Sequence, residues 1–434
     1  MRLVFIRKPI LVICYLVFFI LFVLFKTEAQ SSHSDTIRLS LPEMEKIFLD
    51  SNLTLLAGHY GVDAQRALIQ QAKTWDNPML NTDQVIAANG KFFPYGKNSD
   101  GSYSGQYYIQ VQQLIKTAGK RGKLINLATT NAKLSELQLQ DVLRNLRYQL
   151  RSDYYTIQQQ LGTKWIYETQ KLQLKKLLSG MDAQLIAGNI AQKEYLRIQA
   201  LLIALEQDIT QLNKDIEDNQ RDLKVLLQIK NSVFIKPIDQ ANNIPLNLVN
   251  AEIMFDTAKI SNPNYLLQLT QTVYQEQNLT YQKSLRTPDL TISPNFDRNS
   301  NFSPNYFGLG ISLPLPILNS NKGNIKSAEY SIKQQQTITA SAETELWNNI
   351  NTAYHKLLMT LKQNNSDQKD FYTKYQAMYQ NVLMSYQSKQ IGLLEFLDFF
   401  NDYTASQQRL LQQNLSLQLA KEELNYHTGV NLLK

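Results

Sequence analysis

The stretch Glu194-Tyr195-Leu196 recurs as Glu395-Phe396-Leu397, 201 positions further along the chain. Other positions related by the same offset are Gly122 and Gly323, Ile209 and Leu410, Ile216 and Leu417, and Leu223 and Leu424. A similarity that returns at a fixed offset indicates two copies of one structural unit. We therefore expect an internal two-fold repeat in which each copy has the same order of elements.

The distribution of proline indicates where the helices lie. No proline occurs between Pro94 and Pro237, and none follows Pro316. Proline is excluded from helix interiors because it lacks an N–H group and clashes with the preceding turn. Each half is therefore predicted to contain a short stretch with proline and glycine, followed by a very long helical stretch.

Apolar side chains in the first proline-free stretch recur at helical spacing. They are Leu139, Leu143, Leu146, Leu150, Tyr154, Ile157 and Leu161. The mean step of about 3.7 residues predicts a nearly straight helix, and about 58 residues would give it a length of about 90 Å. A break near Ser179-Gly180 or Gly188-Asn189 would turn the chain back and form a long antiparallel helical hairpin.

Two shorter stretches alternate with a period of two, which is typical of strands. In residues 107–112 the apolar or aromatic face consists of Tyr107, Ile109 and Val111. In residues 307–313 it consists of Phe307, Leu309, Ile311 and Leu313, and the opposite face holds only glycine and serine.

These patterns predict a mainly helical fold with a small β part. The first repeat, 30–230, is expected to contain a helix at 41–75, strands within 79–117 and a helical hairpin at 119–229. A linker rich in proline and asparagine covers 231–250. The second repeat, 251–434, is expected to contain a helix at 251–286, strands within 288–317 and a helical hairpin at 321–430.

The N-terminus has the layout of a signal peptide. Arg2, Arg7 and Lys8 precede an apolar run at 10–25, and a plausible cleavage site follows Ala29. We predict a signal peptide at 1–29. The alternative is a retained anchor, but the run is shorter than the roughly 20 residues that span a bilayer. The only cysteine lies in this run, so the exported chain would have no disulfides, as suits a bacterial envelope protein.

Several classes of function lack a signal in this sequence. The histidines are scattered without ligand spacing, so no metal site is predicted. There is no phosphate-binding glycine loop and no nucleophile paired with a base, so neither an enzyme nor a cofactor is expected. The formal net charge of +7 comes from interspersed charges of both signs, without the basic and aromatic clusters of nucleic-acid-binding proteins.

The strands require a partner for their apolar face. Four strands with one apolar and one polar face suit a lipid-facing barrel, apolar outside and polar inside. Four strands cannot close such a barrel, so the others would come from further copies arranged in a ring. An ordinary antiparallel sheet with one half-buried face is the alternative.

Three motifs resemble the TolC-type outer-membrane efflux proteins (OEP), most closely the cation-efflux, CzcC-like branch. Asn77-Pro78-Met79-Leu80 is similar to the family's entry into its first strand. Residues 113–122, which end in Gly119-Lys120-Arg121-Gly122, resemble its strand-to-helix junction. Residues 313–319, with Pro314 and Pro316, followed by Gly323-Asn324-Ile325, resemble the same junction in the second repeat.

The resemblance implies a homotrimer with a twelve-stranded barrel in the outer membrane of a Gram-negative-type bacterium. The helical hairpins would form a trimeric α-barrel in the periplasm, whose tip meets a periplasmic adaptor protein and an inner-membrane pump of the RND or ABC type. Lys120 and Arg121, together with Lys116 and Lys123, would either bind lipid phosphates at the inner interface or cap the junction between barrel and tube, and we favour the structural role.

The resemblance also implies roles for residues at the hairpin ends. Glu395 and Asp398 match the spacing of the acidic pair at the family's entrance constriction, where three chains would form stacked acidic rings. A solvated helix face is the alternative for these two residues. Residues expected at the periplasmic tip and adaptor contact are Gly188, Asn189, Glu194, Lys389, Gln390 and Gly392. Lys389 stands where the family pattern has glycine.

These expectations combine into one function. The chain would be a passive exit duct of a tripartite efflux or secretion system, opened at its tip by the adaptor and energised by the pump, with metal cations or drugs as possible cargo. The alternative is a periplasmic coiled-coil adaptor or structural stalk without a pore.

Overall fold

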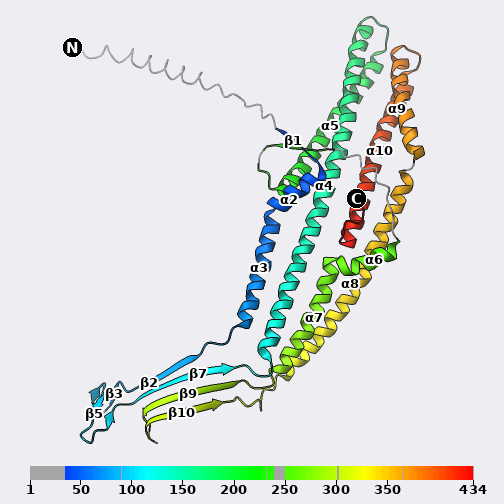
Figure 1. The fold of residues 1–434 in the computed structure, drawn as a ribbon. Helices are drawn as coiled ribbons and strands as arrows, with labels where there is room; N and C mark the ends of the chain where they lie inside the picture. The colour runs from blue at the N-terminus through cyan, green and yellow to red at the C-terminus, as the bar shows by residue number, and fades with distance from the viewer. Residues whose placement is uncertain are drawn as a thin grey trace, which may run out of the picture.

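The computed structural model describes residues 35–88, 90–230, 232–238, 250–300, 303–364 and 366–433. The predicted signal peptide at 1–29 and residues 239–249 of the predicted linker lie outside the described residues. Figure 1 shows a small sheet at one end of an elongated molecule and two helical hairpins at the other end.

The described residues of the first half of the chain form four helices. They are α2 (Leu41–Ser51), α3 (Leu53–Lys73), α4 (Lys120–Ile186) and α5 (Gln192–Leu227). The 67 residues of α4 correspond to about 100 Å, so this helix runs from the sheet to the far tip. There the chain turns back into α5, and the two helices form the first hairpin (Figure 1).

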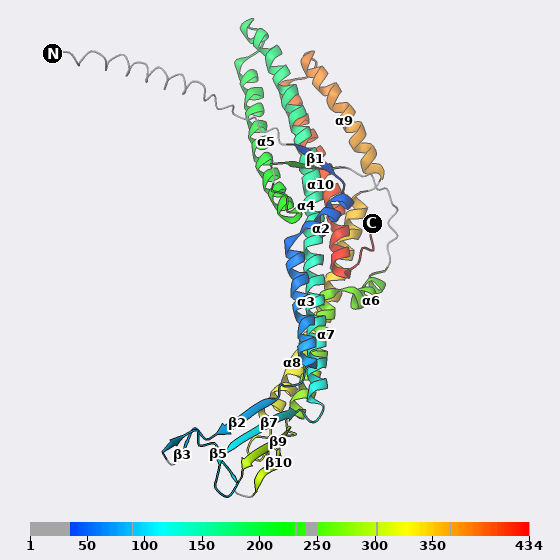
Figure 2. The same cartoon turned by 60° about the vertical axis from the view of Figure 1, so that its left-hand side comes forward.

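The residues that the structure describes in the second half form five helices. They are α6 (Ala251–Ser261), α7 (Pro263–Ser284), α8 (Lys322–Gln363), α9 (Ser366–Gln387) and α10 (Leu393–Thr428). Helices α8 and α9 follow one another toward the tip, and α10 returns beside them. Figure 2 shows that the helices of both halves extend along one long axis, with the sheet at its lower end.

The prediction of one continuous helix at 41–75 is wrong, because Asn52 interrupts it. Its backbone is extended, with φ −69° and ψ 114°. Its side-chain oxygen accepts a hydrogen bond from the Leu55 N–H (3.1 Å), and its Nδ2 donates to the Leu226 carbonyl (2.9 Å). Asn52 therefore begins α3 and at the same time binds the end of α5.

The prediction of one helix at 251–286 is wrong for the same reason. Asn262 has φ −72° and ψ 114°, accepts from the Tyr265 N–H (3.1 Å) and donates to the His427 carbonyl at the end of α10 (2.8 Å). Pro263 follows it and occupies the first turn of α7, where the missing N–H costs nothing. The repeat thus includes a bend that helical periodicity alone does not predict.

The first hairpin was predicted to turn near Ser179-Gly180 or near Gly188-Asn189, and the turn lies at the second of these places. Helix α4 does not break at Gly180. It continues to Ile186, because Leu177, Leu178 and Met181 are buried across this point and their packing outweighs the roughly 1 kcal/mol cost of a glycine. The second hairpin has an unpredicted interruption after α8, at Asn364, a residue type that competes with helical hydrogen bonding.

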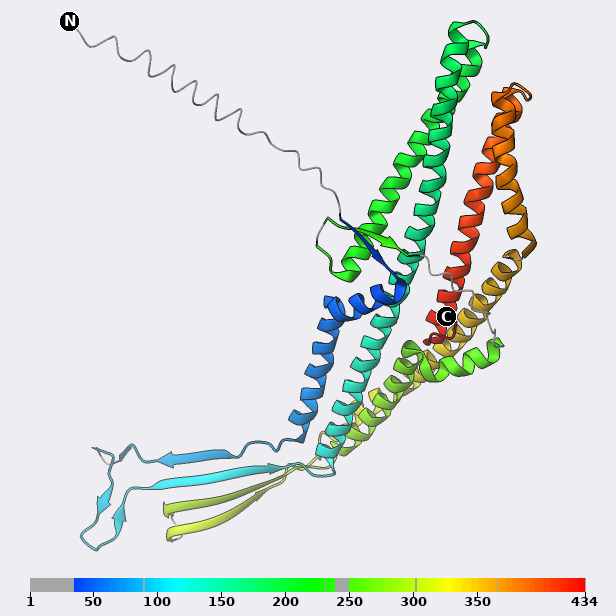
Figure 3. The same ribbon diagram turned by 45° about the horizontal axis from the view of Figure 1, so that its top comes forward.

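A four-stranded antiparallel sheet stands at the other end. Its strands are β2 (Met79–Gln84), β7 (Tyr107–Ile115), β9 (Leu290–Asn299) and β10 (Pro304–Ser312), in the order β10-β9-β7-β2. Two strands come from each half of the chain. Figure 3 shows them leaving the bases of α3, α4, α7 and α8 as one ribbon.

The register of this sheet separates apolar from polar side chains. One row across it consists of Phe307, Phe296, Ile109 and Thr82, and the adjacent row consists of Gly308, Asn295, Gln110 and Asn81. Adjacent rows point to opposite faces of a sheet. One face is therefore largely apolar and the other is polar, and the apolar side chain of Phe307 is 78% exposed.

Six shorter strands complete the described chain. The pairs β3 (Ala87–Ala88) with β4 (Lys91–Phe92), and β5 (Gly96–Lys97) with β6 (Tyr103–Ser104), extend the connection between β2 and β7. The parallel pair β1 (Thr36–Leu39) with β8 (Phe234–Pro237) was not predicted. It joins the start of the described chain to the segment predicted as a linker.

Three apolar clusters hold the helices together. One packs α2 against α4 and α5 around Phe48, Leu150 and Leu223. A second packs α6 against α8 and α10 around Met254, Ile350 and Leu424. The third joins the two hairpins near the tip. Within the described residues, no helix is both long enough and apolar enough to cross a membrane.

Candidate functional site

The two hairpins end in turns with the same hydrogen bonds. At the first, the Gly188 N–H donates to the Leu185 carbonyl (3.0 Å) and the Asn189 N–H donates to the Gln184 carbonyl (2.8 Å). Gly188 has φ +72°, and this left-handed residue closes the helix end.

The second turn repeats this pattern with lysine in place of glycine. The Lys389 N–H donates to the Tyr386 carbonyl (3.0 Å) and the Gln390 N–H donates to the Ser385 carbonyl (2.8 Å). Lys389 has φ +60°. Gly392 has an ordinary extended backbone and precedes α10. The departure from the family pattern therefore changes the residue at this turn and leaves the turn geometry unchanged.

Acidic residues open the two returning helices. Glu194 lies in the first turn of α5 and Glu395 in the first turn of α10, where a negative charge is stabilised by the helix dipole. Burial, and the negative charge of Glu194, raise the pKa of Tyr386 on α9. The structure thus brings acidic groups of both hairpins to the same end of the molecule.

The exposed face of α10 carries a row of three acids. Glu395 and Asp398 are exposed, as is Asp402 one turn further along. Spacings of three and four residues place all three on one side of the helix. Asp402 was missed in the sequence analysis, although the same spacing rule would have found it.

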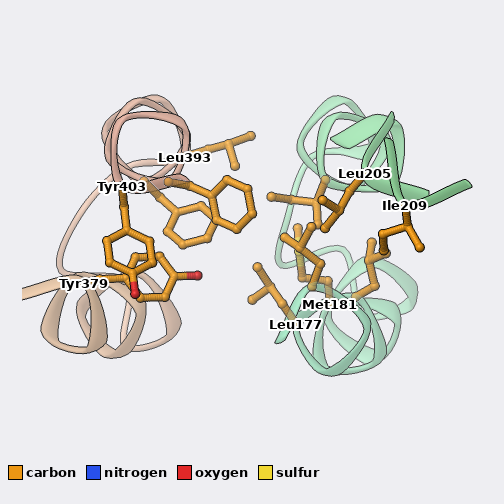
Figure 4. Close-up of a cluster of buried hydrophobic side chains, with 12 residues drawn as sticks. Leu177, Met181, Leu205, Ile209, Tyr379, Leu393 and Tyr403 are labelled. Carbon is orange, nitrogen blue, oxygen red and sulfur yellow. The ribbon is translucent and has the colours of Figure 1, made fainter. Parts of the chain in front are cut away.

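The opposite face of α10 is aromatic and buried. Phe396 stacks on Tyr386 of α9 with a ring separation of 4.7 Å, and Tyr403 stacks on Tyr379 at 4.1 Å. Figure 4 shows Tyr379 and Tyr403 on one side of the cluster and Leu177, Met181, Leu205 and Ile209 of the first hairpin on the other. This packing fixes the rotation of α10 about its axis and keeps the acidic row outside.

Polar contacts also connect the two hairpins below the tip. The Tyr379 hydroxyl donates to Gln173 Oε1 (2.7 Å), and Gln170 Nε2 donates to the Thr404 hydroxyl (2.7 Å). Burial raises the pKa of Tyr379, so its hydroxyl stays protonated and remains a donor. Gln408 Nε2 also donates to the Tyr167 hydroxyl, so these bonds add to the packing of the apolar cluster that joins the hairpins.

The predicted junction residues lie at the far end from the tip. Lys120 is buried, and its Nζ donates to the Thr287 carbonyl (2.6 Å) and to Asp289 Oδ1 (2.7 Å). Asp289 also accepts from the Thr117 N–H (2.9 Å). Lys120 thus ties the start of α4 to the residues that precede β9 in the other repeat.

The other junction residues differ in their surroundings. Gly119 has φ +67°, which forms the bend between β7 and α4. The Arg121 guanidinium lies over the Trp75 ring at 4.6 Å and donates to the Lys73 carbonyl. A Cβ added at Gly122 or at Gly323 would meet no atom of another described element within 4 Å. Pro314 and Pro316 belong to an exposed apolar segment after β10.

No group of acidic, histidine or cysteine side chains in the described residues is arranged to hold a metal ion. A model of the family described as outer membrane efflux protein matches residues 46–227 and 251–430. The chain belongs to the outer membrane efflux protein family. The two matched segments of this efflux protein correspond to the two halves seen in the fold.

One similar curated protein of the efflux family is the cobalt-zinc-cadmium resistance protein CzcC of Cupriavidus metallidurans. It is 20% identical over 298 residues, which cover 67% of this chain and 66% of the relative. The matched part therefore spans slightly less than two thirds of that protein's length.

Solved structures with the same fold include three outer-membrane proteins. CusC is 15% identical with a TM-score of 0.72, covering 93% of this chain and 96% of CusC. The CmeC outer membrane channel of Campylobacter jejuni is 12% identical with a TM-score of 0.73, covering 90% and 86%. The MtrE outer membrane channel of Neisseria gonorrhoeae is 14% identical with a TM-score of 0.69, covering 94% and 95%. These similarities confirm the predicted fold class.

Proposed function

We propose that this efflux-family chain is one subunit of a homotrimeric exit duct in the outer membrane. Strands β2, β7, β9 and β10 of three chains close a twelve-stranded barrel in lipid, and the helical hairpins extend it as a tube into the periplasm. Cargo diffuses through this passive conduit, while an inner-membrane pump supplies the energy and an adaptor opens the tip.

The register of the sheet is the observation that carries this proposal. Rows of apolar side chains alternate with rows of asparagine, glutamine, glycine and serine across all four strands. An apolar outer face and a polar inner face are what a barrel in a bilayer requires. In water, the same exposed apolar face would favour aggregation.

The edges of the sheet support closure by further copies. Within the part of the chain that the structure describes, strands β10 and β2 each have a neighbour on one side only. They run in opposite directions, so β2 of one chain can pair antiparallel with β10 of the next without breaking the alternation. Unpaired strand edges cannot remain in hydrocarbon, which makes pairing between copies obligatory.

The acidic row of α10 supports a cation-selective entrance. Three copies of Glu395 and Asp398 around one axis would form two rings of carboxylates, and such rings favour cations. Similarity to a protein named for cobalt, zinc and cadmium resistance makes divalent metal cations the cargo we propose. A pump of the RND or ABC type would deliver them.

The decisive experiment measures ion selectivity in planar lipid bilayers. Replacing Glu395→Gln and Asp398→Asn together should lower the preference for cations. The matched control is Asp215→Asn with Asp218→Asn, two exposed acids at the same spacing on α5, which should leave the selectivity unchanged. Unchanged selectivity in the α10 double variant would exclude the acidic entrance.

Localisation tests the duct itself, independently of its selectivity. The wild-type protein should fractionate with the outer membrane and migrate faster on gels before heating than after heating. A monomer recovered with soluble periplasmic proteins would instead indicate an adaptor or stalk without a pore.

A further inference from the structure

A pocket near the middle of the helical region is lined by three arginines. Arg144, Arg147 and Arg151 follow one another on a single face of α4, and they form one wall of a cavity of about 220 Å³. The end of α10 and the bend between α6 and α7 supply the other walls. The cavity therefore lies where the two repeats meet, away from both the tip and the sheet.

Two of these arginines are held in place by partners. Arg151 Nη1 donates to Glu422 Oε2 (2.7 Å) and its Nε donates to Glu45 Oε1 (2.5 Å). Arg144 Nη2 donates to Asp141 Oδ1 (2.6 Å), and its guanidinium lies over the Tyr426 ring at 4.2 Å. These contacts fix one wall of the pocket in advance of any binding.

Arg147, between them, has no such partner. Among the described residues, nothing forms an ion pair or hydrogen bond with its guanidinium, and its Nε is buried without an acceptor. The Nε of Arg144 is buried in the same way. A guanidinium does not lose its proton in proteins, and a buried donor without an acceptor is costly.

The acids around the pocket do not neutralise Arg147. Glu422 is the one acidic residue among the described residues that line the cavity, and it is bound to Arg151. The rings of Tyr148 and Tyr426, 5.1 Å apart, line another part of the wall. The pocket thus combines a cationic side, free hydrogen-bond donors and an aromatic surface.

We propose that this pocket binds a small soluble oxyanion, a phosphate or carboxylate group, through the guanidinium group of Arg147. The planar guanidinium presents paired N–H groups that match both anions. The cavity is smaller than the pockets of drug-sized ligands, which suits an anion of a few heavy atoms. Arg147 lies 27 residues along α4 from Lys120, about 40 Å, so the source is the aqueous phase and not a lipid head group at the sheet.

Phosphate and carboxylate binding can be measured on the purified full-length protein by calorimetry. Inorganic phosphate and acetate are titrated at constant ionic strength, with chloride as the reference anion. Wild-type protein should bind at least one of them, and Arg147→Met should weaken that binding by about ten-fold or more. Arg147→Lys should recover only part of it, because lysine keeps the charge but loses the paired donors.

The control is Arg197→Met, which removes an exposed positive charge from α5 and should leave anion binding unchanged. The proposal is overturned if wild-type protein binds neither anion, or if Arg147→Met and Arg197→Met weaken binding equally. It is also overturned if anions have no effect and Arg147→Met weakens subunit association, because the occupant would then be a carboxylate of a second copy. None of these results depends on pore formation.

Discussion

Lys389 occupies the same position in the second hairpin turn that Gly188 occupies in the first, with the same left-handed backbone and the same two hydrogen bonds. The φ angles are +60° and +72°. A residue with a side chain is less stable than glycine by about 1 kcal/mol in this backbone conformation. Of the two turns, the second carries this cost, because its left-handed residue is Lys389.

We predict that Lys389→Gly is more stable than Lys389→Ala by about 1 kcal/mol. Both variants remove the lysine charge, so the difference between them reports the backbone alone. Thermal unfolding of the two proteins in detergent measures it. Gly188→Ala should lose stability, although no neighbouring atom would contact the new methyl group. Equal midpoints for the two Lys389 variants would contradict the assigned turn.

The bends at Asn52 and Asn262 lead to a second prediction. Asn52→Ala removes an N-cap and leaves the Leu226 carbonyl without its donor, which should cost about 2–3 kcal/mol of unfolding free energy. Asn52→Asp keeps the cap acceptor but loses the donor, and should also be destabilising. Denaturant unfolding measures both. If Asn52→Asp were as stable as wild type, the bond to Leu226 would have no energetic role.

Arg151 connects three helices, which leads to a third prediction. It joins Glu45 on α2 and Glu422 on α10 to α4, and its side chain is only 10% exposed. Arg151→Met should lower the unfolding free energy by about 3 kcal/mol, because it leaves the buried carboxylate of Glu422 and the half-buried carboxylate of Glu45 unpaired. The control is Arg66→Met at an exposed ion pair with Glu136, which should change stability little. If both variants lost similar amounts of unfolding free energy, the buried ion pairs of Arg151 would contribute no more than the exposed pair of Arg66, which contradicts the prediction.

Asp153 should make stability depend on pH. Burial, and then the negative charge of Asp222, raise the pKa of Asp153 to about 7. Its Oδ2 is buried without a partner among the described residues. Between about pH 4 and pH 7 the folded chain holds a proton that the unfolded chain has lost, so stability falls as the pH rises through this window.

Asp153→Asn should remove this dependence. The advantage of the variant over wild type should grow from pH 4 to pH 7 and stay constant above pH 7, as measured by unfolding midpoints in matched buffers. Asp215→Asn, at an exposed site on α5, should give no such trend. The assignment fails if Asp153→Asn differs from wild type by the same amount at pH 5 and pH 8.

The sequence alone indicated the mainly helical class, the two-fold repeat, the alternating strands and the family. These features depend on residues that are close together in the sequence or that recur at a fixed spacing. They include the spacing of apolar residues, the exclusion of proline and the short residue motifs. The acidic spacing of Glu395 and Asp398 is of the same kind, since residues three apart on a helix share a face.

Only the tertiary structure decided the features that depend on residues far apart in the chain. The bend at Asn52 requires the carbonyl of Leu226, and the corresponding bend at Asn262 requires that of His427. The pairing of β1 with β8, and the meeting of Arg147 with the end of α10, join segments that no periodicity relates. Helical propensity at these places is weak compared with the hydrogen bonds and burial gained across the fold, so the long-range contacts determine the local structure.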